Sequence, residues 1–295
     1  VQDRATVRDP ARWLAFCDRV VGRVHDAVMW DELLHAVNRV KWGVWSFAEL
    51  RRLLAVAPAL KAKYRSVSFI GPAVIDFEWD YLAAALRCIP RGARLDALSA
   101  HLYVDRRGAP EACQGRFNAL GKLQVFRAMA LATSTVEDHL VVSEFNWPLK
   151  DTREWSPVGA PYVSPGPRFN DPSVGEAEAA AYALRYILLA LCSGLADNMV
   201  FWSLAAHGFG LVDPGVNPDD AWRQRPAFAA LKTFFAILRH GHFTEAIARG
   251  EGGVWAMRFV SGDGRNIVVA WTTAATKPPA PPALPFKAAK CLDLH

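Results

Sequence analysis

The sequence predicts an α/β fold: a (β/α)₈ TIM-barrel-like domain that lacks its first strands at the N-terminus and carries a small C-terminal β appendage. Three observations support this prediction. Apolar runs typical of buried strands alternate with segments at helical spacing, five times along the chain. The length of 295 residues suits one barrel of about 250 residues plus an appendage. Two β-rich runs joined by a turn follow the last helix.

The elements follow from caps, apolar runs and helical spacing. Asp9 and Pro10 cap the first expected helix, and Ser46 with Glu49 three residues later forms a capping box for the second. The expected strands are 28–37, 66–72, 95–104, 140–145 and 199–204, and the expected helices are 10–24, 46–63, 76–89, 110–134, 174–194 and 226–239. Continuous apolar strands are typical of a parallel sheet that is buried on both faces.

The domain organisation follows from the same order. Residues 1–240 are expected to form a partial barrel, and residues 241–295 an appendage with a hairpin over 253–272 and a proline-rich tail at 277–285. Five strand–helix units do not close an eight-stranded barrel, and no strand precedes the first helix. We therefore expect about three units to be missing at the N-terminus, with an open α/β sheet as the alternative.

Composition restricts the class of protein. The net charge of +5 is small and the charges are interspersed, which disfavours nucleic-acid binding. No apolar stretch reaches the roughly 18 residues of a membrane span. The five cysteines are far apart and odd in number, so they predict neither a disulfide framework nor a zinc site and mildly favour the cytoplasm. A signal peptide preceding Val1 would change that localisation, and the oligomeric state is not predicted.

Active sites of parallel barrels form where the strands end, so the polar residues at those ends are the candidates. In chain order they are His35, Asn38, Asp76, Glu78, His101, Tyr103, Asp105, Glu144, Asn146, Trp147, Trp202 and His207. Glu144 stands out because it lies at the tip of an apolar strand, where an unpaired charge is costly. A structural ion pair with an arginine is the alternative explanation.

Three segments resemble a known family. Residues 141–148, with the sequence VVSEFNWP, are preceded by SAHLY at 99–103 and followed by VFWSL at 200–204. Their order and spacing resemble strands seven, six and eight of the retaining (β/α)₈ glycoside hydrolase clan, the 4/7 superfamily, over roughly residues 28–240.

The resemblance implies roles for individual residues. Glu144 would be the nucleophile, His101 and Tyr103 would line the sugar pocket, and Trp202 would be the platform under the sugar ring. The many aromatic residues of the chain, 11 Trp and 16 Phe, suit sugar binding but also suit a protein core.

One motif departs from the family. The clan ends strand four with Asn-Glu, whose glutamate is the general acid/base, whereas this chain has His35-Ala36-Val37-Asn38 there. A retaining mechanism needs two carboxyl groups about 5–5.5 Å apart. Three explanations remain open. His35, Asp105 or Glu32 supplies the proton; the protein binds glycans without cleaving them; or a carboxylate from a missing N-terminal segment completes the site.

Two hypotheses follow. The first is a glycoside hydrolase that cleaves an O-glycosidic bond and needs no metal or organic cofactor. Its catalytic residues would be Glu144 and His35, and its substrate-binding residues Asn38, His101, Tyr103, Asn146, Trp147 and Trp202. The long segment 150–171 would form a wall of its cleft. The second is a non-catalytic glycan-binding or assembly protein on the same scaffold. His240-Gly241-His242 predicts a solvated turn in preference to a metal site.

Overall fold

The computed structural model describes residues 1–104, 108–152 and 173–273 of the chain. The chain divides into two compact units, which are described separately. Unit 1 comprises Val1–Arg106, Cys113–Asn146 and Ser193–Trp202, and unit 2 comprises Arg107–Ala112, Trp147–Cys192 and Ser203–His295.

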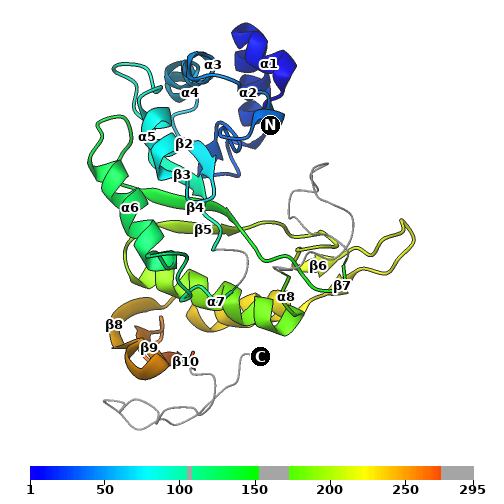
Figure 1. Ribbon diagram of the computed structural model, residues 1–295, viewed down its shortest axis with the longest axis vertical. Coiled ribbons are helices and arrows are strands. Elements are labelled where there is room, and N and C mark those ends of the chain that lie inside the picture. The colour runs from blue at the N-terminus through cyan, green and yellow to red at the C-terminus, as the bar shows by residue number, and fades with distance from the viewer. Residues whose placement is uncertain (105–107, 153–172, 274–295) are drawn as a thin grey trace. The chain divides into compact units, whose positions relative to one another are not determined.

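Unit 1 contains a curled half-barrel sheet of five strands in the order β1-β2-β3-β4-β5 (Figure 1). Every pair of neighbouring strands is parallel. The strands are β1 (Trp30–Glu32), β2 (Ser68–Ile75), β3 (Ala97–His101), β4 (Leu140–Phe145) and β5 (Asn198–Phe201). The predicted parallel order is therefore confirmed, and the sheet is that of a partial TIM-barrel-like α/β fold.

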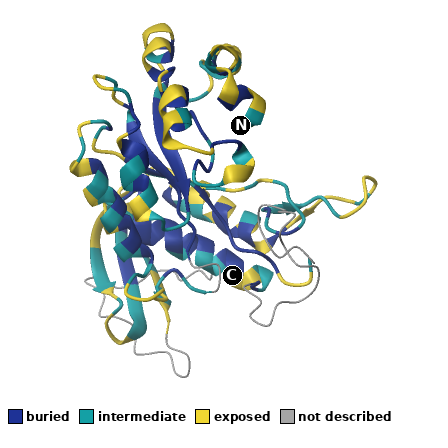
Figure 2. Cartoon of the chain, turned by 45° about the horizontal axis from the view of Figure 1, so that its top comes forward, coloured by how far each residue is buried: buried dark blue, intermediate teal, exposed yellow. Residues whose placement is uncertain are grey.

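Burial distinguishes the central strands from the outer ones. β2, β3 and β4 are buried along nearly their whole length, whereas β1 and β5 are only half-buried. Figure 2 shows the buried residues concentrated along the middle of the sheet. The prediction of strands buried on both faces is correct for the central three and wrong for the outer two, because an outer strand has a neighbour on one side only.

The first strand is shorter than the predicted 28–37. Its ladder with β2 ends at Glu32, and Ala36 has a positive φ of 41°. This left-handed conformation is incompatible with an extended strand. The backbone after Glu32 therefore turns, although Val37 still donates a hydrogen bond to the carbonyl of Ala73 at 3.2 Å.

The helices of unit 1 flank this sheet, with α4 and α5 packed against β2 and α6 against β4. They are α1 (Arg4–Arg8), α2 (Pro10–Val24), the 3₁₀ helix η1 (Val40–Trp42), α3 (Phe47–Leu54), α4 (Ala57–Lys63), α5 (Trp79–Leu86) and α6 (Ala119–Leu131). The single helix expected over 46–63 is in fact two, because Pro58 lacks a backbone N–H and suits the first turn of a new helix.

The predicted caps form, with one change. The side chain of Asp9 accepts hydrogen bonds from the first turn of α2, as expected. Ser46 accepts from the backbone N–H of Glu49, but the Glu49 carboxylate accepts from Trp45 N at 2.9 Å and not from Ser46 N. Glu49 also pairs with Arg4 at 2.8 Å, so α3 is tied to α1.

Unit 2 contains two packed helices and two antiparallel sheets among its described residues. Its elements are α7 (Glu176–Cys192), β6 (Val212–Asp213), β7 (Arg223–Gln224), α8 (Pro226–Leu238), β8 (His242–Arg249), the 3₁₀ helix η2 (Glu251–Gly253), β9 (Val254–Val260) and β10 (Asn266–Thr272). The predicted hairpin is the β9–β10 pair, which is antiparallel. Strand β8 completes a three-stranded sheet and was not predicted.

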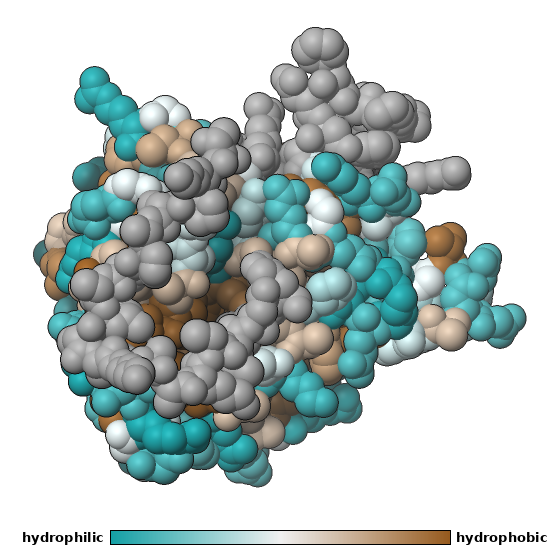
Figure 3. Space-filling view, turned by 90° about the horizontal axis from the view of Figure 1, so that it is seen from below, coloured by the Kyte–Doolittle hydropathy of each residue, from teal (hydrophilic) through white to brown (hydrophobic). Residues whose placement is uncertain are grey.

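The surface in Figure 3 combines hydrophilic residues with an apolar area near its centre. Within the described residues, no helix has the length and apolar character needed to cross a membrane.

Some predictions fall outside the described residues: the proline-rich tail at 277–285, most of the segment 150–171, and Asp105. The domain boundary at residue 240 stays a prediction.

Candidate active site

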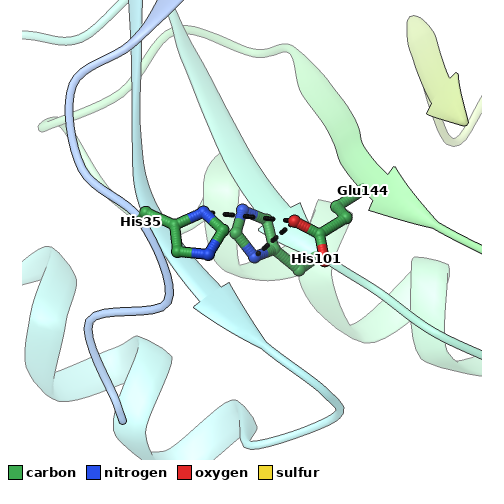
Figure 4. A group of neighbouring side chains, drawn as sticks. All are labelled: His35, His101 and Glu144. Atoms are coloured by element: carbon green, nitrogen blue, oxygen red, sulfur yellow. Dashed lines mark ion pairs between the residues drawn. The ribbon is translucent and has the colours of Figure 1, made fainter. Parts of the chain in front are cut away.

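Four predicted site residues lie together in unit 1, at the carboxyl end of the curled sheet. His101 is the last residue of β3, Tyr103 follows it by two residues, and Glu144 lies near the end of β4. His35 belongs to the turn that follows β1. Figure 4 shows the two imidazole rings directed toward the Glu144 carboxylate. We call these four residues and Glu32 the histidine cluster.

Glu144 is the centre of the cluster and is 4% exposed. The Tyr103 hydroxyl donates a hydrogen bond to Glu144 Oε1. Its other oxygen, Oε2, lies 3.5 Å from His101 Nδ1 and 4.0 Å from His35 Nδ1. A phenol therefore holds one carboxylate oxygen, while the second faces two imidazoles. Such partners offset the cost of removing a carboxylate from water.

His101 connects Glu144 to a second carboxylate. Its side chain is 1% exposed, and its Nε2 lies 3.0 Å from Glu32 Oε2. Burial is the largest influence on the pKa of His101 and lowers it, but the charge and hydrogen bond of Glu32, together with the charges of Glu144 and Asp76, leave that pKa raised. Burial is likewise the largest influence on the pKa of Glu32 and raises it, but the charge of His101 together with hydrogen bonds from His101 and two serines leaves that pKa lowered. The pair therefore favours imidazolium beside carboxylate.

A β-bulge explains why two consecutive residues of β4 serve one cluster. Side chains of a regular strand alternate between faces. The pairing with β5 shifts register between Val142 and Phe145. Phe145 lies three residues after Val142 on β4, whereas their partners Met199 and Phe201 are two residues apart on β5. Ser143 can therefore donate to Glu32 Oε1 while Glu144 reaches His101. Re-aiming a side chain is a common use of such bulges.

His35 is positioned through its ring and its backbone. Its ring packs edge-on against Trp42, at 4.7 Å between centroids, and lies 4.6 Å from the His101 ring. Gln2 brackets its backbone, donating to His35 O at 2.6 Å and accepting from His35 N at 3.0 Å. Burial, assisted by the nearby His101 charge, lowers the pKa of His35 to about 4. His35 is therefore neutral at pH 7.

Ala36 occupies the place that the family resemblance assigns to the acid/base glutamate. It is fully buried, and it clusters with Ile75 and Tyr103. Its positive φ of 41° is unusual for a residue other than glycine, and such strained positions concentrate at functional sites. The backbone therefore has a special conformation there, but the side chain is a methyl group.

A second group of strand-end residues, which we call the arginine cluster, consists of Asn38, Arg39, Asp76 and Glu78. Arg39 pairs with Asp76 at 2.8 Å and with Glu78 at 2.6 Å. The Asn38 amide donates to Ile75 O at 2.9 Å and to Glu78 at 2.6 Å, and its oxygen accepts from Ile75 N at 3.0 Å. The Asn38 side chain is thus used to hold the end of β2.

The remaining predicted residues differ in what they offer a ligand. Trp202, just after β5, is 45% exposed, so part of its ring is open to solvent. Its carbonyl accepts a hydrogen bond from the buried Asn146 side chain. Trp147 belongs to unit 2 and is 2% exposed, with its indole N–H donating to Gly108 O at 3.1 Å. The Trp147 ring also contacts Tyr182, so it is committed to packing within that unit.

Sequence reasoning named Glu32 only as an alternative proton donor and missed Ser143 and Arg39. The sequence signal for Glu32 was its charged side chain inside an apolar run. Burying a charge is costly unless another group pairs with it, so a partner was to be expected. Its partner lies 69 residues away in the chain, so spacing alone could not identify His101. Arg39 gave a weaker signal because charged loop residues are common.

Comparisons with known proteins identify the scaffold. No protein-family model matches the chain, and no curated protein matches it in sequence. Solved structures do match. A GH39 enzyme from Xanthomonas axonopodis pv. citri has a TM-score of 0.57 at 16% identity, over 85% of this chain and 50% of that one. A GH39 β-xylosidase from Caulobacter crescentus has a TM-score of 0.53 at 18% identity, over 86% of this chain and 54% of that one.

A GH30 endoxylanase from Clostridium papyrosolvens matches with a TM-score of 0.50 at 12% identity, over 90% of this chain and 56% of that one. The chain thus spans about half the length of these solved structures. At such identities the likeness concerns the fold. The chain has the partial TIM-barrel-like fold that these glycoside hydrolase structures share.

Proposed function

We propose that this chain is a glycoside hydrolase of the retaining type, with Glu144 as the nucleophile. The observation that carries the proposal is the position of Glu144. It is a buried carboxylate near the carboxyl end of a central parallel strand, and it accepts a hydrogen bond from the Tyr103 phenol. Parallel barrels place their reacting groups at this end of the sheet. Glycosidase-like neighbours of the fold support the choice of reaction.

In the proposed reaction, Glu144 Oε2 attacks the anomeric carbon and forms a glycosyl–enzyme bond as the bond to the leaving oxygen breaks. His35 gives its proton to that oxygen. In the second step His35 takes a proton from water, the resulting hydroxide attacks the anomeric carbon, and Glu144 is released. The 4.0 Å between His35 Nδ1 and Glu144 Oε2 is shorter than the about 5–5.5 Å between the two carboxyl groups of a retaining enzyme, so the proposed reaction requires His35 to move outward when a sugar binds.

The low pKa of His35 sets the expected pH behaviour. Since burial lowers this pKa to about 4, a protonated donor is abundant only in acid. Poorly activated leaving groups should therefore be cleaved faster toward pH 4 than at pH 7. Activated aryl glycosides need little protonation and should be hydrolysed near neutral pH as well.

The sugar itself would be held by residues around the cluster. Trp202, with an exposed ring just beyond β5, would stack on one face of the sugar. His101 and Tyr103 would position Glu144 and line the pocket, and Asn146 would contribute a polar group. Replacing Trp202 with alanine should raise KM more than it lowers kcat, because stacking is present in both the ground and transition states.

A second candidate function is glycan binding without cleavage. Ala36 favours it, because a buried methyl group stands where the clan has its proton donor. A barrel can keep its sugar pocket after losing one of its two catalytic groups. The first function predicts cleavage of a glycosidic bond, and the second predicts binding without cleavage.

Hydrolysis assays distinguish these functions. Chelator-treated protein is incubated with a panel of nitrophenyl glycosides that includes a β-xyloside, and nitrophenol release is measured for the wild type, Glu144→Gln and the matched strand-end control Glu78→Gln. The proposal expects turnover in the wild type and the control and a loss of about 10³-fold or more in Glu144→Gln. Glycan binding that is unchanged by Glu144→Gln, with no turnover by any variant, would support the second function.

A further inference from the structure

We propose that His35 Nδ1, His101 Nδ1 and Glu144 Oε2 bind one divalent cation of the zinc type. One ligand atom from each of these residues lies within 4.8 Å of those of the other two, and both imidazoles face Glu144 Oε2 with Nδ1 (Figure 4). His35 and His101 supply nitrogen ligands and Glu144 supplies an oxygen. The ligands come from the turn after β1 and from strands β3 and β4, so the curled sheet brings together residues far apart in sequence.

The spacing is close to that of a zinc site. Zinc–nitrogen bonds are about 2.0–2.1 Å and zinc–oxygen bonds about 2.0–2.2 Å, so ligand atoms of a tetrahedral site lie roughly 3.3 Å apart. Here Glu144 Oε2 is 3.5 Å from His101 Nδ1 and 4.0 Å from His35 Nδ1. Small inward rotations of the side chains, mainly of the partly exposed His35, would complete the geometry.

His101 is prepared as a metal ligand. Its Nδ1 is buried, is directed at Glu144 Oε2, and has no hydrogen-bond partner among the described residues. Its other ring nitrogen lies 3.0 Å from Glu32, and Glu32 is itself held by Ser143. A carboxylate on the far nitrogen of a ligating histidine fixes the ring orientation and strengthens the ligand. The Glu32–His101 pair has this arrangement.

The remaining chemistry selects the class of cation. Two imidazoles and one carboxylate suit zinc and the neighbouring transition metals, whereas magnesium and calcium prefer sites made of oxygen. Metal binding requires a neutral His101, so the ion would displace the imidazolium proton at Nδ1 and take its place beside the Glu144 carboxylate, while Glu32 stays at Nε2. Three protein ligands would leave a fourth position open for water.

Metal binding would have a consequence for the proposed hydrolase. The cation would occupy Glu144 Oε2 and His35 together, so a loaded site could neither attack a sugar nor donate a proton. Zinc would act as a reversible inhibitor. The binding itself does not depend on any glycosidase activity.

The test is a calorimetric titration of the chelator-treated chain with Zn²⁺, with circular dichroism to verify the fold of each variant. We expect one Zn²⁺ per chain. His35→Ala, whose side chain is 20% exposed and therefore tolerant of change, should weaken binding by more than about 100-fold. Glu32→Gln should weaken it by about 10–100-fold through His101. His207→Ala is the matched control, because His207 pairs with Asp213 at 2.9 Å within unit 2.

Titration with Co²⁺ gives a second readout, since visible absorption of the bound ion reports nitrogen and oxygen ligands in tetrahedral geometry. The inference is overturned if folded wild type binds no Zn²⁺, if Mg²⁺ binds as tightly as Zn²⁺, or if His35→Ala binds Zn²⁺ like the wild type. Hydrolysis is measured separately in chelator. Zinc binding without hydrolysis would support this inference and contradict the proposed function. Hydrolysis without zinc binding would support the proposed function and contradict this inference.

Discussion

The two clusters at the strand ends of unit 1 contain similar numbers of charged groups and differ in their chemistry. In the arginine cluster, Asp76 and Glu78 are 37% and 40% exposed and both pair with Arg39. In the histidine cluster, Glu144 is almost fully buried and faces a phenol and two imidazoles. An arginine stays charged at all ordinary pH values, so it holds carboxylates in place without exchanging protons. Imidazoles can gain and lose a proton near neutrality.

Location at a strand end is therefore insufficient to identify a reacting carboxylate. Burial and the type of partner decide whether a charge is structural or chemically active. Changes to the histidine cluster test that distinction, and the first two are compared with changes to the arginine cluster.

The largest difference is expected in catalysis. His35→Ala should reduce hydrolysis of poorly activated glycosides by about 10²–10⁴-fold while changing nitrophenyl glycosides far less, because only the former need a proton donor. Arg39→Gln should leave both rates nearly unchanged. Comparing kcat/KM for a disaccharide and a nitrophenyl glycoside measures the effect. Equal losses on both substrates would remove His35 from the donor role.

The next difference concerns stability. Glu32→Ala leaves the His101 imidazolium buried without its carboxylate, which should reduce the free energy of unfolding by about 3 kcal/mol, the lower end of the range for a broken buried pair. Glu78→Ala removes an exposed partner of Arg39 and should cost less than about 1 kcal/mol. Urea denaturation measures both values. Equal losses in the two variants would contradict the contrast between the clusters.

The pH dependence of stability should reflect His35. Its pKa falls from 6.5 in the unfolded chain to about 4 in the fold, so the unfolded state binds more protons between these values. The His35 contribution is therefore fully present above pH 6.5 and is lost as the pH falls toward 4. The free energy of unfolding is measured in chelator for the wild type and for His35→Gln. The difference between the two values should change by roughly 2 kcal/mol across this pH window, after allowance for the partial exposure of His35. Parallel stability curves would show that burial does not perturb His35.

The smallest predicted difference separates the buried Tyr103 from the half-buried Tyr81. Tyr103→Phe removes the hydrogen bond to the charged Glu144 and should lower the free energy of unfolding by about 1.5 kcal/mol. Tyr81→Phe is the matched control, because the Tyr81 hydroxyl donates to the neutral carbonyl of Val37 at 2.9 Å. That loss should be about 0.5–1 kcal/mol. Equal effects would contradict the stronger hydrogen bond expected when the acceptor is the Glu144 side chain.

Much of the fold was predictable because it depends on local pattern. The apolar run that ends in Glu144 predicted the bounds of β4, and the alternation of strands and helices predicted the parallel order. The Ser-Gly-Asp-Gly turn predicted the β9–β10 hairpin. Each of these features is set by residues that are close together in the sequence.

The histidine cluster was only partly predictable because it depends on tertiary geometry. His101, Tyr103 and Glu144 were expected at one end of the sheet, and they lie there. The bulge that turns Ser143 and Glu144 to the same cluster and the curl that brings Glu32 to His101 leave no local signature. The packing of Trp147 within unit 2 likewise depends on residues distant in the chain.

The contact between Gln2 and His35 has a practical consequence for handling the protein. The Gln2 amide brackets the backbone of His35 on both sides, and Arg4 anchors the same short segment through a 2.7 Å bond to the carbonyl of Gly43. Engineered variants should therefore retain Gln2, because losing its amide would loosen the imidazole on which proton transfer and ion capture both rely.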